Sequence, residues 1–411
     1  MDLPEEVLAG ILANSSFRDI VRFKLVCREW KSLIESAHFR RLFHSTNHDL
    51  SSSAWSLVSK GDGSMNEVVS HCGRDGHCLS RSLGSYTSSF VRDLIRFKDQ
   101  EDDEKPELQA TRQKIRKVKV VACTDGLVLL SVKPLSGSHA YYVSNPVLRQ
   151  WVEIPPSHQE DHHFKISGLV TRVENGVVSG YKVVRMETVF VAKPTSSDVR
   201  IYSSETGEWT IEKIQCPRAV DFIVNFDPVN LNGSLYWLQA SMLSHAELNR
   251  IDQAIISLDL YADGSEADRV RTISLPDHQP PISCRHNFLT TSGGFLMHIR
   301  MLRENGNPRV RVWKKSNGSD DWVMMWDMNT TCLEWVPKAM HPFETDVIYM
   351  WSPNAEIMVS FNMRTPYGTC QRISSKPWRL EFLSQFVLPR WLESLPSPPN
   401  LTLNVLPRGP A

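Results

Sequence analysis

The segment VVACTDGLVLLSV (120–132) decides the fold of this chain, together with HAYYVSNPVLRQWVEIP (139–155), which follows it. Each segment holds two short runs of β-branched, aliphatic or aromatic residues. Turn-forming residues separate the runs, Asp125-Gly126 in the first segment and Asn145-Pro146 in the second. Short apolar runs between turn residues are typical of antiparallel β-strands. The two segments together therefore predict four consecutive strands.

The pattern recurs along the chain at a nearly constant spacing. A pair of small turn residues followed by an apolar strand occurs at Asp125-Gly126, Asn232-Gly233 and Gly293-Gly294, and GYKVVRM (180–186) occupies the place expected for a further copy. The intervals are roughly 50 to 60 residues, which suits one four-stranded propeller blade per repeat.

A second marker has the same period and consists of a strand, a polar turn and a Trp-bearing or apolar strand. It occurs from Val143 to Trp151, Tyr202 to Trp209, Leu258 to Ile273 and Val312 to Trp322. Two interleaved markers with one period indicate blades arranged in a ring, which leaves only short, protected sheet edges. Residues 46–395 are therefore predicted to form a propeller of about six blades, with five to seven allowed by the period.

The sequence pattern is less clear in residues 50–115, where the ring must close. AWSLVSK (54–60) and NEVVSHC (66–72) can be strands of a first blade, and DQEDDEKPE (99–107) is interpreted as a solvated, charged loop. The Pro-rich residues 396–411 are expected to form a loosely ordered tail.

The N-terminal residues have a different periodicity. In LPEEVLAGILANSSFRDIVRFKLVCREWKSLI (3–34), apolar residues follow helical spacing three times over, and Pro4 suits the first turn of a helix. We expect three short amphipathic helices within residues 1–45. A unit of about 40 residues rarely buries enough apolar surface to be stable alone, so some of this surface must meet the rest of the chain or a partner.

These residues resemble the F-box, which docks the SKP-type adaptor of cullin-RING ubiquitin ligases. The resemblance rests on Leu3-Pro4, Ile11-Leu12 and VCREWKSLI (26–34), which occur in order at the expected separations. It implies that six residues supply most of the adaptor-facing or motif-core contacts, namely Leu3, Pro4, Ile11, Leu12, Val26 and Trp30. Without the motif, a helical cap packed on the following domain would be the simpler interpretation.

The β-rich region resembles the F-box-associated or kelch-type propeller of plant F-box proteins. CTDGLVLL, YYVSNPVLRQWVEIPP, GYKVVRM and YSSETGEW carry this resemblance. The fold class is then α+β and multidomain, with a three-helix F-box before a large all-β propeller. The implied function is that of the substrate-recognition subunit of an SCF-type ubiquitin ligase, which binds the SKP adaptor, and through it cullin, and holds an unknown target protein. Candidate recognition loops are residues 157–164, 240–250 and 277–287.

Composition narrows the classes of partner and compartment. Lys plus Arg and Asp plus Glu each number 46, so the chain has no excess of positive charge that would favour binding to nucleic acid or to an anionic membrane. The sequence has no apolar run long enough to span a membrane and no secretory signal pattern. Its eight cysteines are mostly isolated, which favours reduced thiols and a cytoplasmic and/or nuclear location.

The sequence contains none of the nucleotide-binding, hydrolase or zinc-protease motifs that would indicate an enzyme, and we expect no catalytic residues and no cofactor. His71, Cys72, His77 and Cys78 are of types that bind zinc, but four ligands from one short loop would reach a tetrahedron only with strain. We interpret this cluster as a polar loop and predict no metal site.

Other conspicuous side chains have ordinary structural interpretations. His162-His163 lie in a polar loop pattern, and KIRKVKV (114–120) reads as a strand with one solvated face. Blade packing explains the tryptophans at positions 151, 209, 237, 313, 322, 326, 335 and 351.

Two alternatives to the ligase interpretation remain open. One is a propeller enzyme or small-ligand sensor whose helices form a structural cap. The other keeps the adaptor contact and lets the propeller bind a hormone, sugar or other small molecule beside the protein target. The exposure of the apolar N-terminal residues separates a cap from a docking module, since a cap would bury them against the β-rich region.

Overall fold

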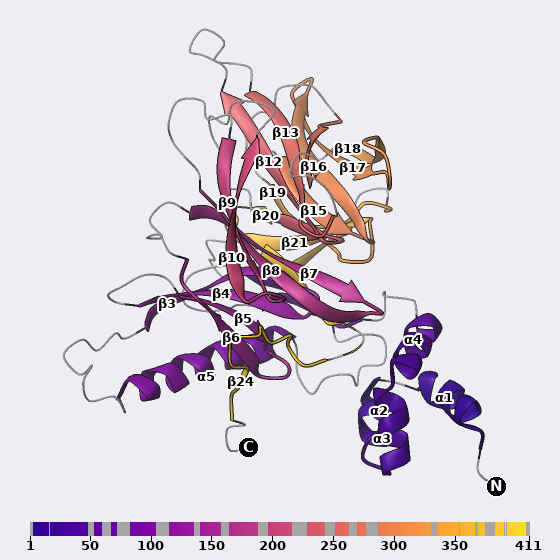
Figure 1. Ribbon diagram of the computed structural model, residues 1–411. Helices are drawn as coiled ribbons and strands as arrows, with labels where there is room; N and C mark the ends of the chain where they lie inside the picture. The colour runs from indigo at the N-terminus through magenta and orange to yellow at the C-terminus, as the bar shows by residue number, and fades with distance from the viewer. Residues whose placement is uncertain are drawn as a thin grey trace.

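The computed structural model describes residues 3–15, 17–47, 53–59, 67–71, 83–103, 115–134, 140–157, 164–187, 196–215, 228–242, 251–262, 269–276, 287–329, 335–352, 354–365, 369–374, 383–389, 391 and 393–407. A helical module at the N-terminus lies beside a large β-structure, and a fifth helix packs on the underside of the β-structure in the view of Figure 1. None of the helices in these ranges combines the length and apolar character needed to cross a membrane.

The N-terminal module contains the three predicted helices and one more. The helices are α1 (Glu5–Ala13), α2 (Phe17–Phe23), α3 (Arg28–Glu35) and α4 (Ala37–Thr46). Ser36 begins α4 by accepting a hydrogen bond from the Phe39 N–H at 3.0 Å. Phe39 and Phe43 are fully buried against α1 and α3. The fourth helix therefore supplies much of the core that three short helices lack.

The β-structure consists of six antiparallel sheets, which we call blades I to VI. Blade I contains β3 (Ile115–Thr124), β4 (Leu127–Pro134), β5 (Ala140–Asn145), β6 (Gln150–Ile154) and β24 (Asn404–Val405). Blade II contains β7 (Phe164–Glu174), β8 (Val177–Glu187), β9 (Ser196–Ser203) and β10 (Glu208–Gln215). Blade III contains β11 (Val229–Leu231), β12 (Ser234–Met242), β13 (Ile251–Asp259) and β14 (Val270–Ser274).

Blades IV and V repeat this arrangement, and blade VI has three strands. Blade IV contains β15 (Asn287–Ser292), β16 (Phe295–Glu304), β17 (Asn307–Lys315) and β18 (Trp322–Asn329). Blade V contains β19 (Val336–Met340), β20 (Val347–Ser352), β21 (Ile357–Asn362) and β22 (Thr369–Ser374). Blade VI contains β1 (Trp55–Ser59), β2 (Glu67–His71) and β23 (Leu383–Val387).

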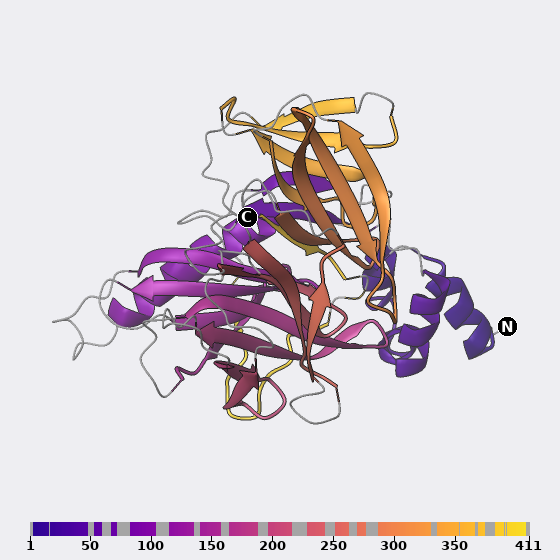
Figure 2. The ribbon, with the colours of Figure 1, turned by 90° about the horizontal axis from the view of Figure 1, so that it is seen from above.

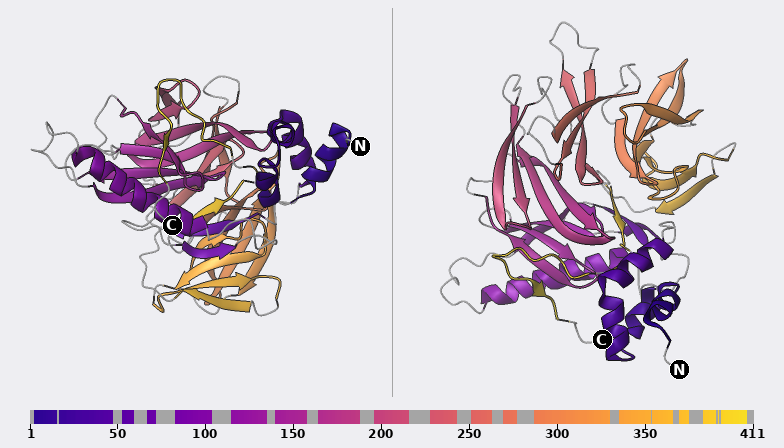
Figure 3. Two further views of the ribbon diagram at one scale, coloured as in Figure 1. Left: turned by 90° about the horizontal axis from the view of Figure 1, so that it is seen from below. Right: turned by 45° about the vertical axis from the view of Figure 1, so that its right-hand side comes forward.

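The blades form a closed ring through contacts between their innermost strands, and Figure 3 shows the sheets in two further views. The innermost strands β3, β7, β11, β15, β19 and β23 each pack beside the next one, and β23 also packs beside β3. Blade VI closes the ring because β23, from late in the chain, pairs with β1 along its whole length. The prediction of a helical module followed by a propeller of five to seven blades is confirmed, as is the expectation that AWSLVSK and NEVVSHC contain strands.

The repeated Gly marker corresponds to the first hairpin turn of a blade. Asp125-Gly126, Asn232-Gly233 and Gly293-Gly294 all have positive φ and join the first two strands of blades I, III and IV. Two successive positive φ values belong to the tight hairpin turns whose twist matches that of the strands. In blade II the same turn is Asn175-Gly176, which was not predicted; it directly precedes β8, the strand that contains GYKVVRM.

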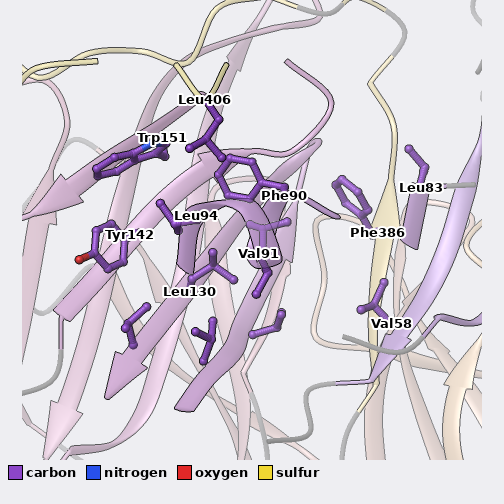
Figure 4. Packing of buried hydrophobic residues seen from close by; sticks show 14 of the residues in the cluster. Val58, Leu83, Phe90, Val91, Leu94, Leu130, Tyr142, Trp151, Phe386 and Leu406 are labelled. Atoms are coloured by element: carbon purple, nitrogen blue, oxygen red, sulfur yellow. The ribbon is translucent and has the colours of Figure 1, made fainter. Parts of the chain in front are cut away.

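The helix α5 (Leu83–Asp103) was not predicted, and the interpretation of 99–107 as a loop is wrong for residues 99–103, which end this helix. Leu83, Phe90, Val91 and Leu94 share one helical face and pack into a core with strands of blades I and VI. Figure 4 shows these side chains beside Phe386, Trp151 and Leu406. The helix thus seals the junction where the ring closes.

The prediction of a loosely ordered tail is also wrong for the described residues 396–407. Asn404 and Val405 form β24 and pair with Trp151 and Gln150 at the edge of blade I. Leu406 is buried in the core beneath α5, and its N–H donates to the Arg149 carbonyl at 2.9 Å. The prolines before β24 are compatible with this edge position, because they need no ladder hydrogen bond there.

Candidate functional site

The outer face of α1 is apolar and exposed. Leu3, Val7 and Ile11 follow one another at a spacing of four residues, and their exposed fractions are 57%, 47% and 54%. Ala9, Leu12 and Ala13 form the opposite face of α1 and are buried in the core of the helical module. The helix therefore has two apolar faces, and the described chain covers only one of them.

A second exposed apolar pair lies in the connection between α2 and α3. Leu25 is 86% exposed and Val26 is 61% exposed. The next residue, Cys27, begins α3, and its Sγ accepts a hydrogen bond from the Trp30 N–H at 3.4 Å. The Trp30 ring packs edge to face on Phe23, with centroids 5.4 Å apart. Together these contacts fix the connection while leaving its two aliphatic side chains in solvent.

We define the docking surface as Leu3, Pro4, Val7, Ile11, Leu25 and Val26, all of which are exposed. Four of the six residues predicted from the motif are in this set. The structure places the other two, Leu12 and Trp30, in or against the core of the module. Val7 and Leu25 were not among the predicted contacts, although the spacing of Val7 between Leu3 and Ile11 was a signal that could have included it.

The helical module touches the propeller through a different surface. Trp391, which follows β23, packs against both Phe39 and Phe43 of α4, and Lys24 lies over its ring at 5.3 Å. Arg40 pairs with Glu393 at 3.4 Å. In Figure 2 the module accordingly lies at one side of the β-structure, with α1 at its outer edge. A structural cap would bury the docking surface against the β-structure. The described part of the β-structure does not cover this surface.

The module meets the rim of the propeller that carries the Asp125-Gly126 and Asn175-Gly176 turns. A Cβ atom at Gly176 would collide with the His44 ring, so α4 rests directly on this turn. The candidate recognition loops 157–164, 240–250 and 277–287 connect strand ends on the opposite rim, such as Met242 with Ile251. Most of their residues (158–163, 243–250 and 277–286) lie outside the described residues.

Some of the other candidates fall partly outside the described residues as well. His71 ends β2, whereas Cys72, His77, Cys78 and the His162-His163 pair are not described. The described ranges contain no cluster of three or more His, Cys, Asp or Glu residues suited to a metal ion. In β3, Val118 and Val120 are buried and Lys119 is exposed, which agrees with the predicted strand.

The tryptophans interpreted as blade-packing residues are confirmed in that role where they are buried. Trp151, Trp237, Trp313 and Trp351 are each at most 8% exposed and lie in strands of four different blades. They therefore pack within and between blades instead of forming a surface for stacking a ligand.

Two family descriptions match this chain, one for each part of the structure. Residues 1–42 match the family described as the F-box domain. Residues 53–378 match the family described as F-box protein At3g26010-like, beta-propeller. The first match ends within α4, and the second begins just before β1.

Relatives that span nearly the whole chain occur in Arabidopsis thaliana. The putative F-box/kelch-repeat protein At1g15680 is 34% identical over 98% of this chain and 96% of its own length. F-box protein At3g26010 is 32% identical over 98% of this chain and 92% of its own. Putative F-box protein At3g23950 is 30% identical over 97% and 99% of the two chains.

Solved structures resemble the chain only loosely. A chain of the nidogen/laminin complex covers 68% of this chain and 87% of its own length, with a TM-score of 0.35 and 10% identity. The alpha-L-arabinanase of Penicillium chrysogenum covers 62% and 79%, with a TM-score of 0.34 and 12% identity. Similarity at this level carries no argument about activity.

Proposed function

This chain belongs to the F-box proteins with an At3g26010-like β-propeller, and on that premise we propose that it is a substrate-recognition subunit of an SCF-type cullin-RING ubiquitin ligase. The docking surface binds an SKP-type adaptor, and through it cullin. The propeller holds a target protein.

The observation that carries this proposal is the exposure of Leu3, Val7 and Ile11 on α1. Exposing three aliphatic side chains on one face of a helix is unfavourable unless a partner buries them, at about 25 cal/mol per Å² of apolar area. The buried face of the same helix shows that the module already has its own core. The exposed face is thus available for a partner without unfolding the module.

The position of the module suits a tethering function. The module contacts one rim of the propeller, and the loops proposed for target recognition connect strand ends on the other rim. A receptor of this kind raises the effective concentration of target lysines near the ubiquitin carrier, so it needs no catalytic residues of its own. We propose a location in the cytoplasm and/or nucleus, which imaging of a fluorescent fusion would test.

Adaptor binding is the direct test of the docking surface. Ile11→Ala and Val26→Ala each remove an exposed side chain, and truncating a central interface anchor typically costs about 2 kcal/mol, or roughly 30-fold in Kd. Ile211→Ala is the matched control, because Ile211 is also exposed (63%) but lies on β10. Calorimetry with a purified SKP-type adaptor measures all three.

The double variant Ile11→Ala/Val26→Ala should lose adaptor binding while keeping its helical circular dichroism. Affinity capture from cells, with ubiquitin release blocked, should then recover both target proteins and cullin with the wild type and with Ile211→Ala. The same capture with the double variant should recover no cullin. Wild-type affinity of the double variant for the adaptor would refute the proposal.

A further inference from the structure

The last described segment of the chain lies along the outer edge of blade I. We call residues 393–407 the C-terminal strap, and it is the yellow segment that ends in β24 in Figure 1. Leu395 and Leu406 are each 2% exposed, and Leu401 and Leu403 pack against the core between blades I and II. The strap therefore covers apolar surface that these blades would otherwise expose.

A tight turn in the middle of the strap is closed by Ser397. The Leu401 N–H donates to the Pro398 carbonyl at 3.2 Å, and the Ser397 hydroxyl donates to the Leu401 carbonyl at 3.1 Å. Pro399 follows Pro398 at the position of a β-turn that favours proline. Both hydrogen bonds end on Leu401, so they fix the point at which the strap returns to the core.

Ser397 is the accessible member of the three Ser-Pro or Thr-Pro dipeptides in this chain. The other two begin at Ser352, which is 4% exposed at the end of β20, and at Thr365, which is half-buried. Ser397 is exposed and stands between Pro396 and Pro398. A residue that precedes a proline favours extended backbone. The sequence around Ser397 thus favours the extended conformation in which protein kinases bind their substrates.

We propose that Ser397 is a phosphorylation site for a proline-directed protein kinase, and that the phosphate releases the strap from Pro398 onward. In the transfer, Oγ of Ser397 bonds to the γ-phosphorus of ATP, the bond from that phosphorus to the ADP oxygen breaks, and the hydroxyl proton passes to the catalytic Asp of the kinase. The Oγ atom of phosphoserine carries no hydrogen. It can no longer donate to the Leu401 carbonyl, and the dianionic phosphate repels this carbonyl oxygen.

The charges beside the turn determine the direction of the effect. A phosphate adds about −1.5 to −2 charge at pH 7, which orders a segment opposite basic side chains and disrupts it beside acidic ones. The turn packs on Gly207, since a Cβ built there would lie 3.7 Å from Cβ of Pro398. Gly207 belongs to the β9–β10 hairpin, whose turn contains Glu205 and Glu208 and no basic residue, and Arg172 already pairs with Glu205 at 3.0 Å. Phosphorylation is therefore expected to weaken the turn.

Leu395 separates this turn from the contact with the helical module. Its N–H donates to Oε1 of Gln150 at 2.8 Å, and its side chain is buried. Trp391, which packs on α4, precedes this anchor. The phosphate therefore acts on the edge of blade I and on α5, which shares a core with Leu406, while the docking surface keeps its position.

Phosphorylation can be tested on the full-length chain with ATP, Mg²⁺ and two purified proline-directed kinases, a mitogen-activated protein kinase and a cyclin-dependent kinase. Peptide mass spectrometry should find phosphate on Ser397, and Ser397→Ala should remove that phosphate. Ser352→Ala is the matched control and should leave Ser397 phosphorylated. Absence of phosphate from Ser397 with both kinases would overturn the proposal.

Hydrogen exchange then measures the release of the strap. In the phosphorylated chain the amides of Leu401 and Leu406 should exchange about fivefold faster or more, the factor that corresponds to the loss of one typical hydrogen bond. The amides of α1 should keep their wild-type rates. Asn400→Asp is the control for charge, because it adds one negative charge to the same exposed turn and leaves Ser397 able to donate, so its effect should be smaller. Unchanged exchange at Leu401 and Leu406 after phosphorylation would show that the phosphate does not release the strap.

Discussion

The indole ring of Trp391 packs against the ring of Phe43, with the centroids 5.6 Å apart and the planes inclined by 65°. Phe43 belongs to the helical module, and Trp391 belongs to the segment that leaves the last strand of the ring. The segment continues to β24 on blade I, so a single stretch of chain links the helical module, blade VI and blade I. The orientation of the docking surface relative to the propeller therefore depends on this contact.

Trp391→Ala should loosen the helical module from the propeller. Replacing a buried Trp by Ala typically costs about 3 to 5 kcal/mol, because it leaves a cavity that the surroundings fill only partly. Small-angle X-ray scattering should show a larger radius of gyration, and the melting temperature should fall. Glu393→Gln is the control: it removes the partly exposed ion pair with Arg40, worth about 0 to 1 kcal/mol, while the side-chain oxygen of Gln can still accept the hydrogen bond that the Trp391 indole N–H donates to Glu393 at 2.9 Å. This variant should leave the scattering unchanged.

Leu12→Ala and Ile11→Ala should have opposite effects on stability and docking, although the two residues are adjacent. Leu12 is 2% exposed, so its truncation should destabilise the module by about 2 to 5 kcal/mol. Ile11 is 54% exposed, and its truncation should change stability by less than about 0.5 kcal/mol. Thermal unfolding followed by circular dichroism at 222 nm, a wavelength that reports mainly helix, measures both. Equal losses of stability would contradict the assigned faces of α1.

Gly176→Ala should destabilise the contact between α4 and blade II. Gly176 has a φ of +71°, and an added Cβ would collide with the His44 ring. Gly306→Ala is the matched control: it also follows an Asn in a hairpin turn, has a φ of +82°, and has open space around its Cβ position. Both variants should lose roughly 1 to 2 kcal/mol from backbone strain. Gly176→Ala should lose more, and chemical denaturation would measure the difference.

His341 should make the stability of the propeller depend on pH. Burial lowers the pKa of His341, with a smaller contribution from His71, while Glu344 and Asp346 act in the opposite direction. Its Nδ1 also accepts hydrogen bonds from the Phe343 and Glu344 N–H groups at 3.2 and 2.9 Å, which requires this nitrogen to be unprotonated.

The folded chain therefore favours neutral His341, whereas the unfolded chain takes up a proton below about pH 6.5. The contribution of His341 to stability is complete above that pH and decreases as the pH falls toward the lowered pKa of the folded state. Melting temperatures between pH 8 and 5 should fall less steeply for His341→Gln than for the wild type. The control variant His38→Gln, exposed on α4, should keep the wild-type slope. An identical slope for His341→Gln would show that this histidine does not contribute.

Patterns within about 15 residues were sufficient to predict most of the local structure. The turns at Asp125-Gly126, Asn232-Gly233 and Gly293-Gly294, the strands on either side of them, and α1 to α3 all follow from residue type and spacing. These features depend on φ/ψ preferences and on the spacing of apolar residues, and both are determined by residues close together in the sequence. The same short-range signals carried the family resemblance at Leu3-Pro4 and at 26–34.

Packing between distant segments accounts for the rest. No local pattern shows that Phe386 and Val58 lie in neighbouring strands of one blade, that α5 covers them, or that Val405 adds an edge strand to blade I. Such pairings form because many weak apolar contacts together outweigh the entropy of closing a long loop. For the same reason, the helical pattern placed the apolar residues Ile11 and Leu12 on one helix but did not distinguish their environments. Only the packing of α4 and Trp391 established that Leu12 is buried and that Ile11 is free to meet a partner.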